Sequence, residues 1–192
     1  MPATIVRFEM VDRPPRRLFL DTSFIRELIR WAASPQEPRC AASHAFYQKA
    51  RTNNCHLWTT PFAAEEILWA FVREELVRAK APFGLATIAE FKRVRRDDYL
   101  RTLLASRQPL GVMVRALNRL RISFEFPGDQ APMRGDWGSQ VMRTASQLLE
   151  RFPLETADAF HIACSWVAGT NDIASLDDDF KVVDGLTVYC YT

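Results

Sequence analysis

Arg17-Leu18-Phe19-Leu20-Asp21-Thr22-Ser23 joins a short apolar run to a carboxylate and two hydroxyl residues, and the apolar residues that follow it have helical spacing. This order predicts a strand that ends at Leu20 and a helix capped by Thr22 or Ser23. The same pattern recurs at His56-Leu57-Trp58-Thr59, which reads as a strand. Thr60 then caps a helix that has Pro61 in its first turn and an apolar stripe as far as Val77.

The rest of the chain continues this alternation. Residues 86–120 have a helical pattern that breaks at Pro109-Leu110-Gly111, and residues 129–135 read as a loop. Further strands are expected over 122–126, 172–175 and 186–191, and further helices over 137–152 and 156–168. Alternating strands and helices predict an α/β protein with three layers, in which helices flank a central parallel sheet. Ligands of such sheets bind beyond the carboxyl ends of the strands.

Composition narrows the class of protein. A chain of 192 residues with 48% hydrophobic content suits one domain over residues 1–192. It has no apolar span of membrane length and no apolar signal core near its start, which argues against membrane and secreted proteins. The four cysteines form no CxxC pair and the three histidines have no zinc-site spacing, so we expect free thiols in a reducing cytoplasm.

Charge is distributed unevenly along the chain. Residues 92–121 contain nine Lys or Arg and two acidic residues, so this stretch carries +7 while the whole chain carries +2. A basic segment on an otherwise acidic body fits a polyanion partner, because Lys and Arg that contact phosphates release counterions. The alternative is a solvated helix face whose arginine stems cover apolar surface.

Four carboxylates fall where the predicted sheet would bind a ligand. Asp21 and Asp177 follow the carboxyl ends of strands, while Glu66 and Asp158 lie near the starts of helices. Each has an ordinary explanation by itself; a carboxylate in a first helical turn, for example, gains roughly 0.3–1 kcal/mol from the helix dipole. Their shared position indicates a site on one rim of the sheet.

Four segments around these acids resemble the signature blocks of PIN-domain ribonucleases, a family that includes the toxins of VapBC toxin–antitoxin modules. The segments are Leu20-Asp21-Thr22-Ser23, Thr60 with Glu66-Ile67-Leu68, Thr156-Ala157-Asp158-Ala159-Phe160-His161-Ile162-Ala163, and Ser175-Leu176-Asp177-Asp178-Asp179-Phe180. They occur in the family's order, and the resemblance spans residues 18–191 apart from about 80–121.

The resemblance implies a metal-dependent endoribonuclease that uses Mg²⁺ or Mn²⁺. It assigns catalysis and metal binding to Asp21, Glu66, Asp158 and Asp177, with Glu66 preferred to Glu65 because Ile67 and Leu68 follow it. Ser175 and either Thr22 or Ser23 match the supporting hydroxyl residues. It further implies an RNA substrate, a homodimer and, for a toxin, a small antitoxin protein. Hard carboxylate oxygens are the ligands that suit both metals.

The chain departs from the family pattern between Glu66 and Asp158, which lie 92 residues apart. The surplus is the basic helical insertion over residues 80–121. We interpret it as an arm that holds the RNA backbone through Lys92, Arg93, Arg95 and Arg96, with Phe91 and Tyr99 stacking on bases. A dimer interface or a longer helical layer is the alternative interpretation of this stretch. Asp178 and Asp179 are expected either in solvent or around the direct ligands of the metal, with Asp179 capping a turn. His161 is expected to pack or to support Asp158.

Two other classes of function fit parts of the pattern. A catalytically silent module of the same fold would bind RNA or protein without needing four intact acids. A receiver-type phosphotransfer domain would need a lysine at a strand end near its acids. Lys181 follows the Asp177–Asp179 run and does not lie on a predicted strand, so the receiver interpretation is the weaker.

Overall fold

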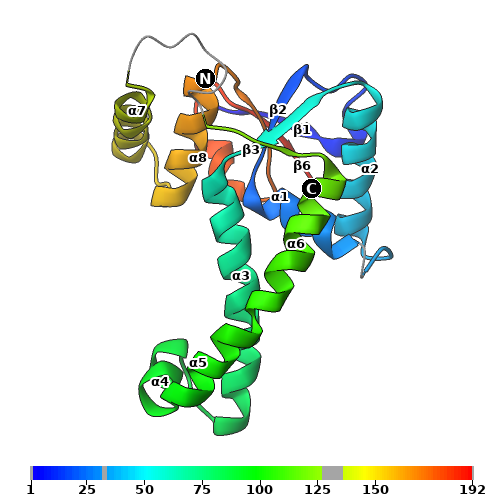
Figure 1. Cartoon of the computed structure of the whole chain (residues 1–192). Coiled ribbons are helices and arrows are strands. Elements are labelled where there is room, and N and C mark those ends of the chain that lie inside the picture. Colours follow the sequence, from blue (N-terminus) through cyan, green and yellow to red (C-terminus); the bar gives the residue numbers. More distant parts are fainter. Residues whose placement is uncertain (1, 32–33, 127–135, 192) are drawn as a thin grey trace. The chain divides into compact units, whose positions relative to one another are not determined.

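The computed structural model describes residues 2–31, 34–126 and 136–191, and the chain divides into two compact units (Figure 1). The first unit comprises residues 1–63 and 122–192, and the second comprises residues 64–121. The loop predicted over 129–135 lies outside the described residues.

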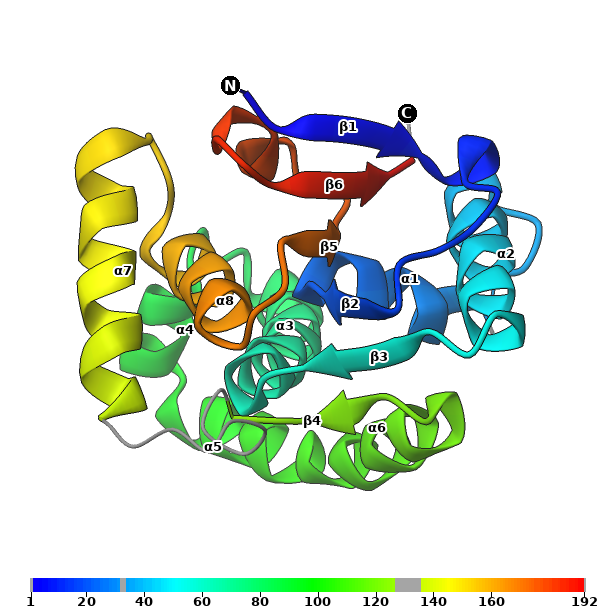
Figure 2. The same cartoon turned by 90° about the horizontal axis from the view of Figure 1, so that it is seen from above.

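The first unit is built on one six-stranded sheet in which all neighbouring strands are parallel (Figure 2). Its spatial order is β1-β6-β5-β2-β3-β4. The strands are β1 (Thr4–Arg7), β2 (Arg17–Leu20), β3 (His56–Thr59), β4 (Ser123–Phe124), β5 (Asp172–Ala174) and β6 (Thr187–Cys190). The predicted parallel α/β architecture is therefore confirmed.

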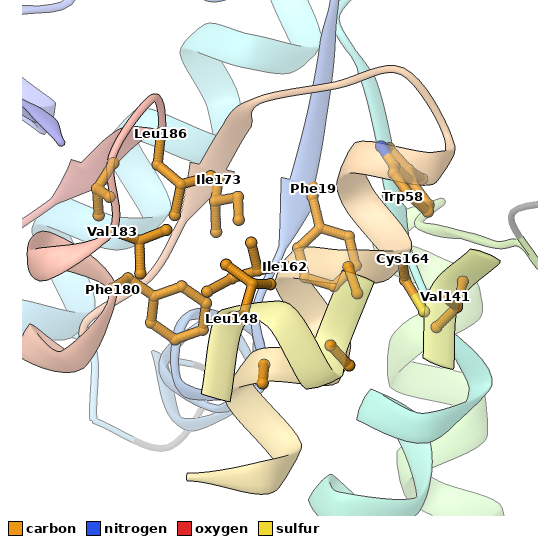
Figure 3. Packing of buried hydrophobic residues seen from close by; sticks show 14 of the residues in the cluster. Phe19, Trp58, Val141, Leu148, Ile162, Cys164, Ile173, Phe180, Val183 and Leu186 are labelled. Carbon is orange, nitrogen blue, oxygen red and sulfur yellow. The ribbon is translucent and has the colours of Figure 1, made fainter. Parts of the chain in front are cut away.

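Alternate residues of a strand point to opposite sides of the sheet, so the apolar strands present side chains that must be buried on both faces. Helices cover both of these faces. On one face Phe19 and Trp58 pack in the same buried cluster as residues of α7 (Trp137–Arg151) and α8 (Thr156–Val167), such as Leu148 and Ile162 (Figure 3). On the other face Tyr189 stacks on Phe46 of α2 (Pro38–Thr52), with ring centroids 5.7 Å apart. Phe46 in turn meets Phe24 of α1 (Thr22–Trp31).

The predicted elements of the first unit are present, with ends one or two residues shorter in several cases. Thr60 caps α3 (Pro61–Lys80) as expected, since its Oγ1 accepts a hydrogen bond from the Ala63 N–H at 3.3 Å. Three short 3₁₀ helices complete the described elements: η1 (Phe8–Met10), η2 (Ala81–Phe83) and η3 (Asp178–Val182).

The second unit consists of α3 from Ala64 onward and three further helices. These are α4 (Ile88–Val94), α5 (Arg96–Ala105) and α6 (Arg107–Leu120). The prediction of a break at Pro109-Leu110-Gly111 is wrong: the turn lies at Ser106, and Pro109 falls in the first turn of α6, where no N–H is needed from it. The unit begins at residue 64 and not at 80, because α3 runs on without interruption.

No helix in the described ranges has both the length and the apolar character that crossing a bilayer requires.

Candidate metal centre at the carboxyl edge of the sheet

The pairing of β2 with β5 brings two predicted site segments together. Leu20 pairs with Ala174, and the Asp21 N–H donates to the Ala174 carbonyl at 3.0 Å. Asp21 and Ser175 therefore lie side by side, each one residue beyond its strand. They are 154 positions apart in the sequence, and only the parallel register joins them.

Asp21 is 4% exposed, and one of its two carboxylate oxygens is held firmly. Oδ2 accepts hydrogen bonds from the Ser23 N–H at 3.1 Å, the Ser23 hydroxyl at 2.5 Å and the Ser175 hydroxyl at 2.9 Å. Oδ1 accepts none from the described residues. The bond to the Ser23 N–H makes Asp21 itself the cap of α1, so the prediction of Thr22 or Ser23 as the cap is wrong.

The two serine hydroxyls connect Asp21 to the loop that carries Asp177. The Leu176 N–H donates to the Ser23 hydroxyl at 2.9 Å, and the Asp177 N–H donates to the Ser175 hydroxyl at 3.0 Å. The hydroxyl oxygens lie 3.2 Å apart. Of the two supporting residues that sequence left open, Ser23 is the one that bonds to Asp21.

Asp158 lies in the first turn of α8 and faces like charges. The pKa of Asp158 is raised from 3.8 to about 7, first by burial and then by the negative charges of Asp21, Asp177 and Asp179, while His161 opposes the rise. His161 is 2% exposed, with its ring 5.8 Å from that of Phe19. The three predicted acids of the first unit therefore act on one another electrostatically.

These three carboxylates have no ion pair with a basic side chain of the part of the chain that the structure describes. Among the described residues no Lys or Arg forms an ion pair with Asp21, Asp158 or Asp177. Asp178 is different, because Lys181 pairs with it at 2.5 Å. The hydrogen bond and charge of Lys181 lower the pKa of Asp178.

Asp177, Asp178 and Asp179 are all exposed, and Phe180 behind them is buried in the core. The Asp177 Oδ1 accepts a hydrogen bond from the Asp179 N–H at 3.1 Å, which caps η3. The capping role expected of Asp179 therefore belongs to Asp177. Phe180 anchors the acidic loop to the cluster that Figure 3 shows around Leu148 and Ile162.

Glu66 lies in the second unit, in the second turn of α3. It is half-buried, whereas Glu65 is exposed. The structure thus brings Asp21, Asp158 and Asp177 together within the first unit, and Glu66 is assigned to the site by sequence alone.

Sequence reasoning missed a second group of potential ligands. Within the described ranges, Glu27, Glu37 and Cys40 are the group of three whose ligand atoms all lie within 4.8 Å of one another, and the carboxylates of Asp21, Asp158 and Asp177 are spread more widely. The Cys40 thiol donates to Glu27 at 2.9 Å, and Glu27 also pairs with Arg30 at 3.2 Å. Burial raises the pKa of Cys40 to about 12, so the thiol stays protonated. Only the Glu37–Cys40 spacing was visible in the sequence.

The basic residues of the second unit have mixed environments. Lys92 lies over the Tyr99 ring, and Arg95 lies over the Phe83 ring while pairing with Asp98 at 2.7 Å. Arg93 and Arg96 are exposed.

The prediction that Phe91 and Tyr99 stack on bases is wrong, since they are 0% and 8% exposed. Both form the core of the second unit with Leu76, and their rings meet edge to face at 6.1 Å. Aromatic residues on one face of a helix have the same spacing in the sequence whether they pack in a protein core or stack on nucleic-acid bases.

Comparison of the chain with protein-family models, with curated proteins and with solved structures finds no match. The interpretation of the site therefore depends on its residues and their geometry.

Replacing Ser175 with alanine is expected to reduce the free energy of unfolding by about 1–3 kcal/mol at pH 8, because a buried carboxylate loses one of its hydrogen-bond donors. Urea denaturation measures the change. Ser165→Ala is the matched control: this serine is equally buried, but it donates to the Ile162 carbonyl of its own helix, an uncharged acceptor. Equal losses in the two variants would contradict a special role for Ser175.

Proposed function

We propose that this protein is a divalent-metal-dependent endoribonuclease that hydrolyses RNA phosphodiester bonds at Asp21, Asp158 and Asp177, with Glu66 as the fourth acid. The observation that carries the proposal is the group of three acids at one sheet edge, where burial and then the charges of Asp21 and Asp177 raise the pKa of Asp158 to about 7. No ion pair with Lys or Arg relieves that repulsion among the described residues.

The donor set fits Mg²⁺ or Mn²⁺. Both are hard cations that prefer oxygen ligands, and Mg²⁺ usually keeps several waters while binding one or two carboxylates. The wide spacing of these carboxylates is compatible with such a hydrated ion. A cation bound there would neutralise the scissile phosphate and lower the pKa of an attacking water.

Several residues of the protein would have separate roles in holding such an ion. Asp21 is oriented by three hydrogen bonds to Oδ2, which leaves Oδ1 as its ligand atom. Ser23 and Ser175 fix the distance between Asp21 and the loop of Asp177. Asp158 must lose its proton to act as a ligand, since protonated carboxyl groups bind cations poorly.

RNA is the substrate that the sequence favours. The four segments around the acids resemble those of PIN-domain ribonucleases, and residues 92–121 carry +7. A basic helical segment would hold the phosphate backbone of RNA without reading its bases.

The proposal is tested by incubating labelled RNA with the purified protein in Mn²⁺, with and without EDTA. Cleavage that stops with EDTA and returns when Mn²⁺ is added in excess supports the proposal. RNA that is bound but never cleaved would favour the alternative, a catalytically silent RNA-binding module.

Neutralising Arg93 and Arg96 together, as glutamines, is expected to weaken RNA binding and to reduce the slope of log K against log salt by about 0.7 for each phosphate that an arginine no longer neutralises. Filter binding in Ca²⁺ at several salt concentrations measures both quantities. Arg78→Gln serves as a control on the same unit, because Arg78 is already paired with Glu75 at 2.5 Å. Unchanged binding by the double variant would favour a protein interface for this surface.

The proposed setting is the cytoplasm, which the four free cysteines support, since all are buried and none forms a disulfide. A homodimer and a small antitoxin partner are part of the same proposal. A short antitoxin-like reading frame immediately upstream, and co-purification of its product, would test the toxin role.

A further inference from the structure

Arg39 lies in the first turn of α2 and reaches across to the loop that carries Asp177. Its guanidinium donates to the Leu176 carbonyl at 3.3 Å, and the side chain is exposed. Leu176 is the residue between Ser175, which bonds to Asp21, and Asp177. The edge of the proposed metal centre thus has an arginine beside it.

Arg39 differs from Lys181, a second basic residue near this loop, in the group to which it binds. Lys181 is committed to Asp178 through an ion pair at 2.5 Å. Arg39 forms no ion pair with a described residue, and a single neutral carbonyl is its hydrogen-bond partner there. A guanidinium has five N–H donors, so most of its bonding capacity is available to a ligand.

A polyanionic substrate needs such a group at this place. RNA must approach a rim whose carboxylates repel phosphates and form no ion pair with a described Lys or Arg: Asp21, Asp158, Asp177 and Asp179. Metal ions would offset the charge at the scissile phosphate, but they leave the neighbouring phosphates facing carboxylates. The planar fork of arginine matches phosphate oxygens better than a lysine ammonium does.

The position of Arg39 selects which phosphate it would bind. Its guanidinium bonds to the carbonyl of Leu176, the residue directly before Asp177. Arg39 therefore lies beside the acidic loop, where it would meet the phosphate next to the one that is cleaved.

We propose that Arg39 releases the Leu176 carbonyl and binds the RNA phosphate next to the scissile one. This inference rests on the proposed ribonuclease function. It makes Arg39 a substrate-binding residue of the first unit, separate from the basic segment of the second unit.

The test compares two phosphodiester substrates in Mn²⁺ with the full-length protein. Short RNA has phosphates on both sides of the scissile bond, whereas bis(p-nitrophenyl) phosphate has one phosphate and none beside it. For Arg39→Gln we expect about a tenfold rise in KM for RNA, as for the removal of a charged hydrogen bond, with kcat little changed. Its salt slope for RNA should fall by about 0.7. Hydrolysis of bis(p-nitrophenyl) phosphate should be unchanged.

Two further variants make the result specific. Arg39→Lys keeps the positive charge. Its dependence of RNA binding on salt should therefore be close to that of the parent, whereas its KM for RNA should lie between those of the parent and Arg39→Gln. Arg16→Gln is the control, because Arg16 is also exposed but precedes β2, at the opposite end of the strand from Asp21.

Unchanged KM and salt slope for RNA in Arg39→Gln would overturn the proposal. An equal loss on both substrates, or a loss of the Mn²⁺-induced thermal shift, would overturn it too, because Arg39 would then only hold the Leu176 carbonyl. If the parent protein cleaves neither substrate, the proposed ribonuclease function fails as well. If the parent protein cleaves RNA and the Arg39→Gln variant cleaves it equally well, only the proposed role of Arg39 fails.

Discussion

Asp158→Asn is expected to abolish RNA cleavage and, in the absence of metal, to make the protein more stable at pH 8. The folded-state pKa of Asp158 is about 7, against an ordinary value of 3.8. Because the fold favours the protonated form, the stability that this group contributes is fully present below pH 3.8. It is lost as the pH rises through 7. Asparagine is neutral at every pH and avoids that loss.

The expected gain at pH 8 is about 1–2 kcal/mol, measured by urea denaturation in EDTA. One pKa unit corresponds to about 1.4 kcal/mol, but Asp158 is only half-buried, so solvent screening reduces the nominal value. At pH 4 the parent is largely neutral at this position and the gain should be small. Asp97→Asn is the matched control: Asp97 also lies in a first helical turn, in α5, but is exposed, so its variant should lose a little stability.

The expected loss of cleavage is at least about 10³-fold, which corresponds to about 4 kcal/mol of transition-state stabilisation. Single-turnover cleavage of labelled RNA in Mn²⁺ measures it. Parent-like cleavage by Asp158→Asn would contradict the assignment of the site. A variant that is inactive but also less stable at pH 8 would contradict the electrostatic account of Asp158.

The parts of the fold that sequence predicted are those with strong local signals. Leu18, Phe19 and Leu20 are all buried, as expected for a central strand covered on both faces. Sequence reasoning missed β1, an edge strand that pairs only with β6 and has mostly exposed side chains. It also missed α2, whose buried face includes the small residues Cys40, Ser43 and Ala50 and so has little apolar contrast.

In the candidate site, too, the sequence predicted the features that depend on local signals and missed the contacts between distant segments. The positions of Asp21 and Asp158 followed from a strand end and a helix start, which are local features. The bonds from Ser23 and Ser175 to one carboxylate oxygen did not, because they depend on the register of β2 against β5. The same holds for Arg39, which meets Leu176 from 137 positions away.

A divalent cation is expected to raise the melting temperature of the parent protein, and the rise should depend on pH. At a concentration of 100 times Kd, binding to the folded state alone contributes about 2.7 kcal/mol. For a chain of 192 residues this amounts to roughly 5–10 °C. Below pH 7 the cation must displace the proton of Asp158, so its affinity should fall by up to about tenfold per pH unit. Thermal shift in Mn²⁺ titrations at pH 5.5, 6.5 and 8, at constant ionic strength, measures both effects.

Two clusters of potential ligand residues could bind the ion, one at the sheet edge and one formed by Glu27, Glu37 and Cys40, and variants of each show which one does. Asp21→Asn should lose most of the shift, because it removes the charge of the buried carboxylate whose Oδ1 is proposed to bind the ion. Asp178→Asn should keep the shift, since Asp178 is exposed and paired with Lys181. Glu27→Gln tests the group of Glu27, Glu37 and Cys40, in which the thiol is protonated and Arg30 already neutralises Glu27. A shift that disappears in Glu27→Gln and persists in Asp21→Asn would move the metal site to the start of α2. That result would separate it from the sheet edge where the acids of β2, β5 and α8 meet.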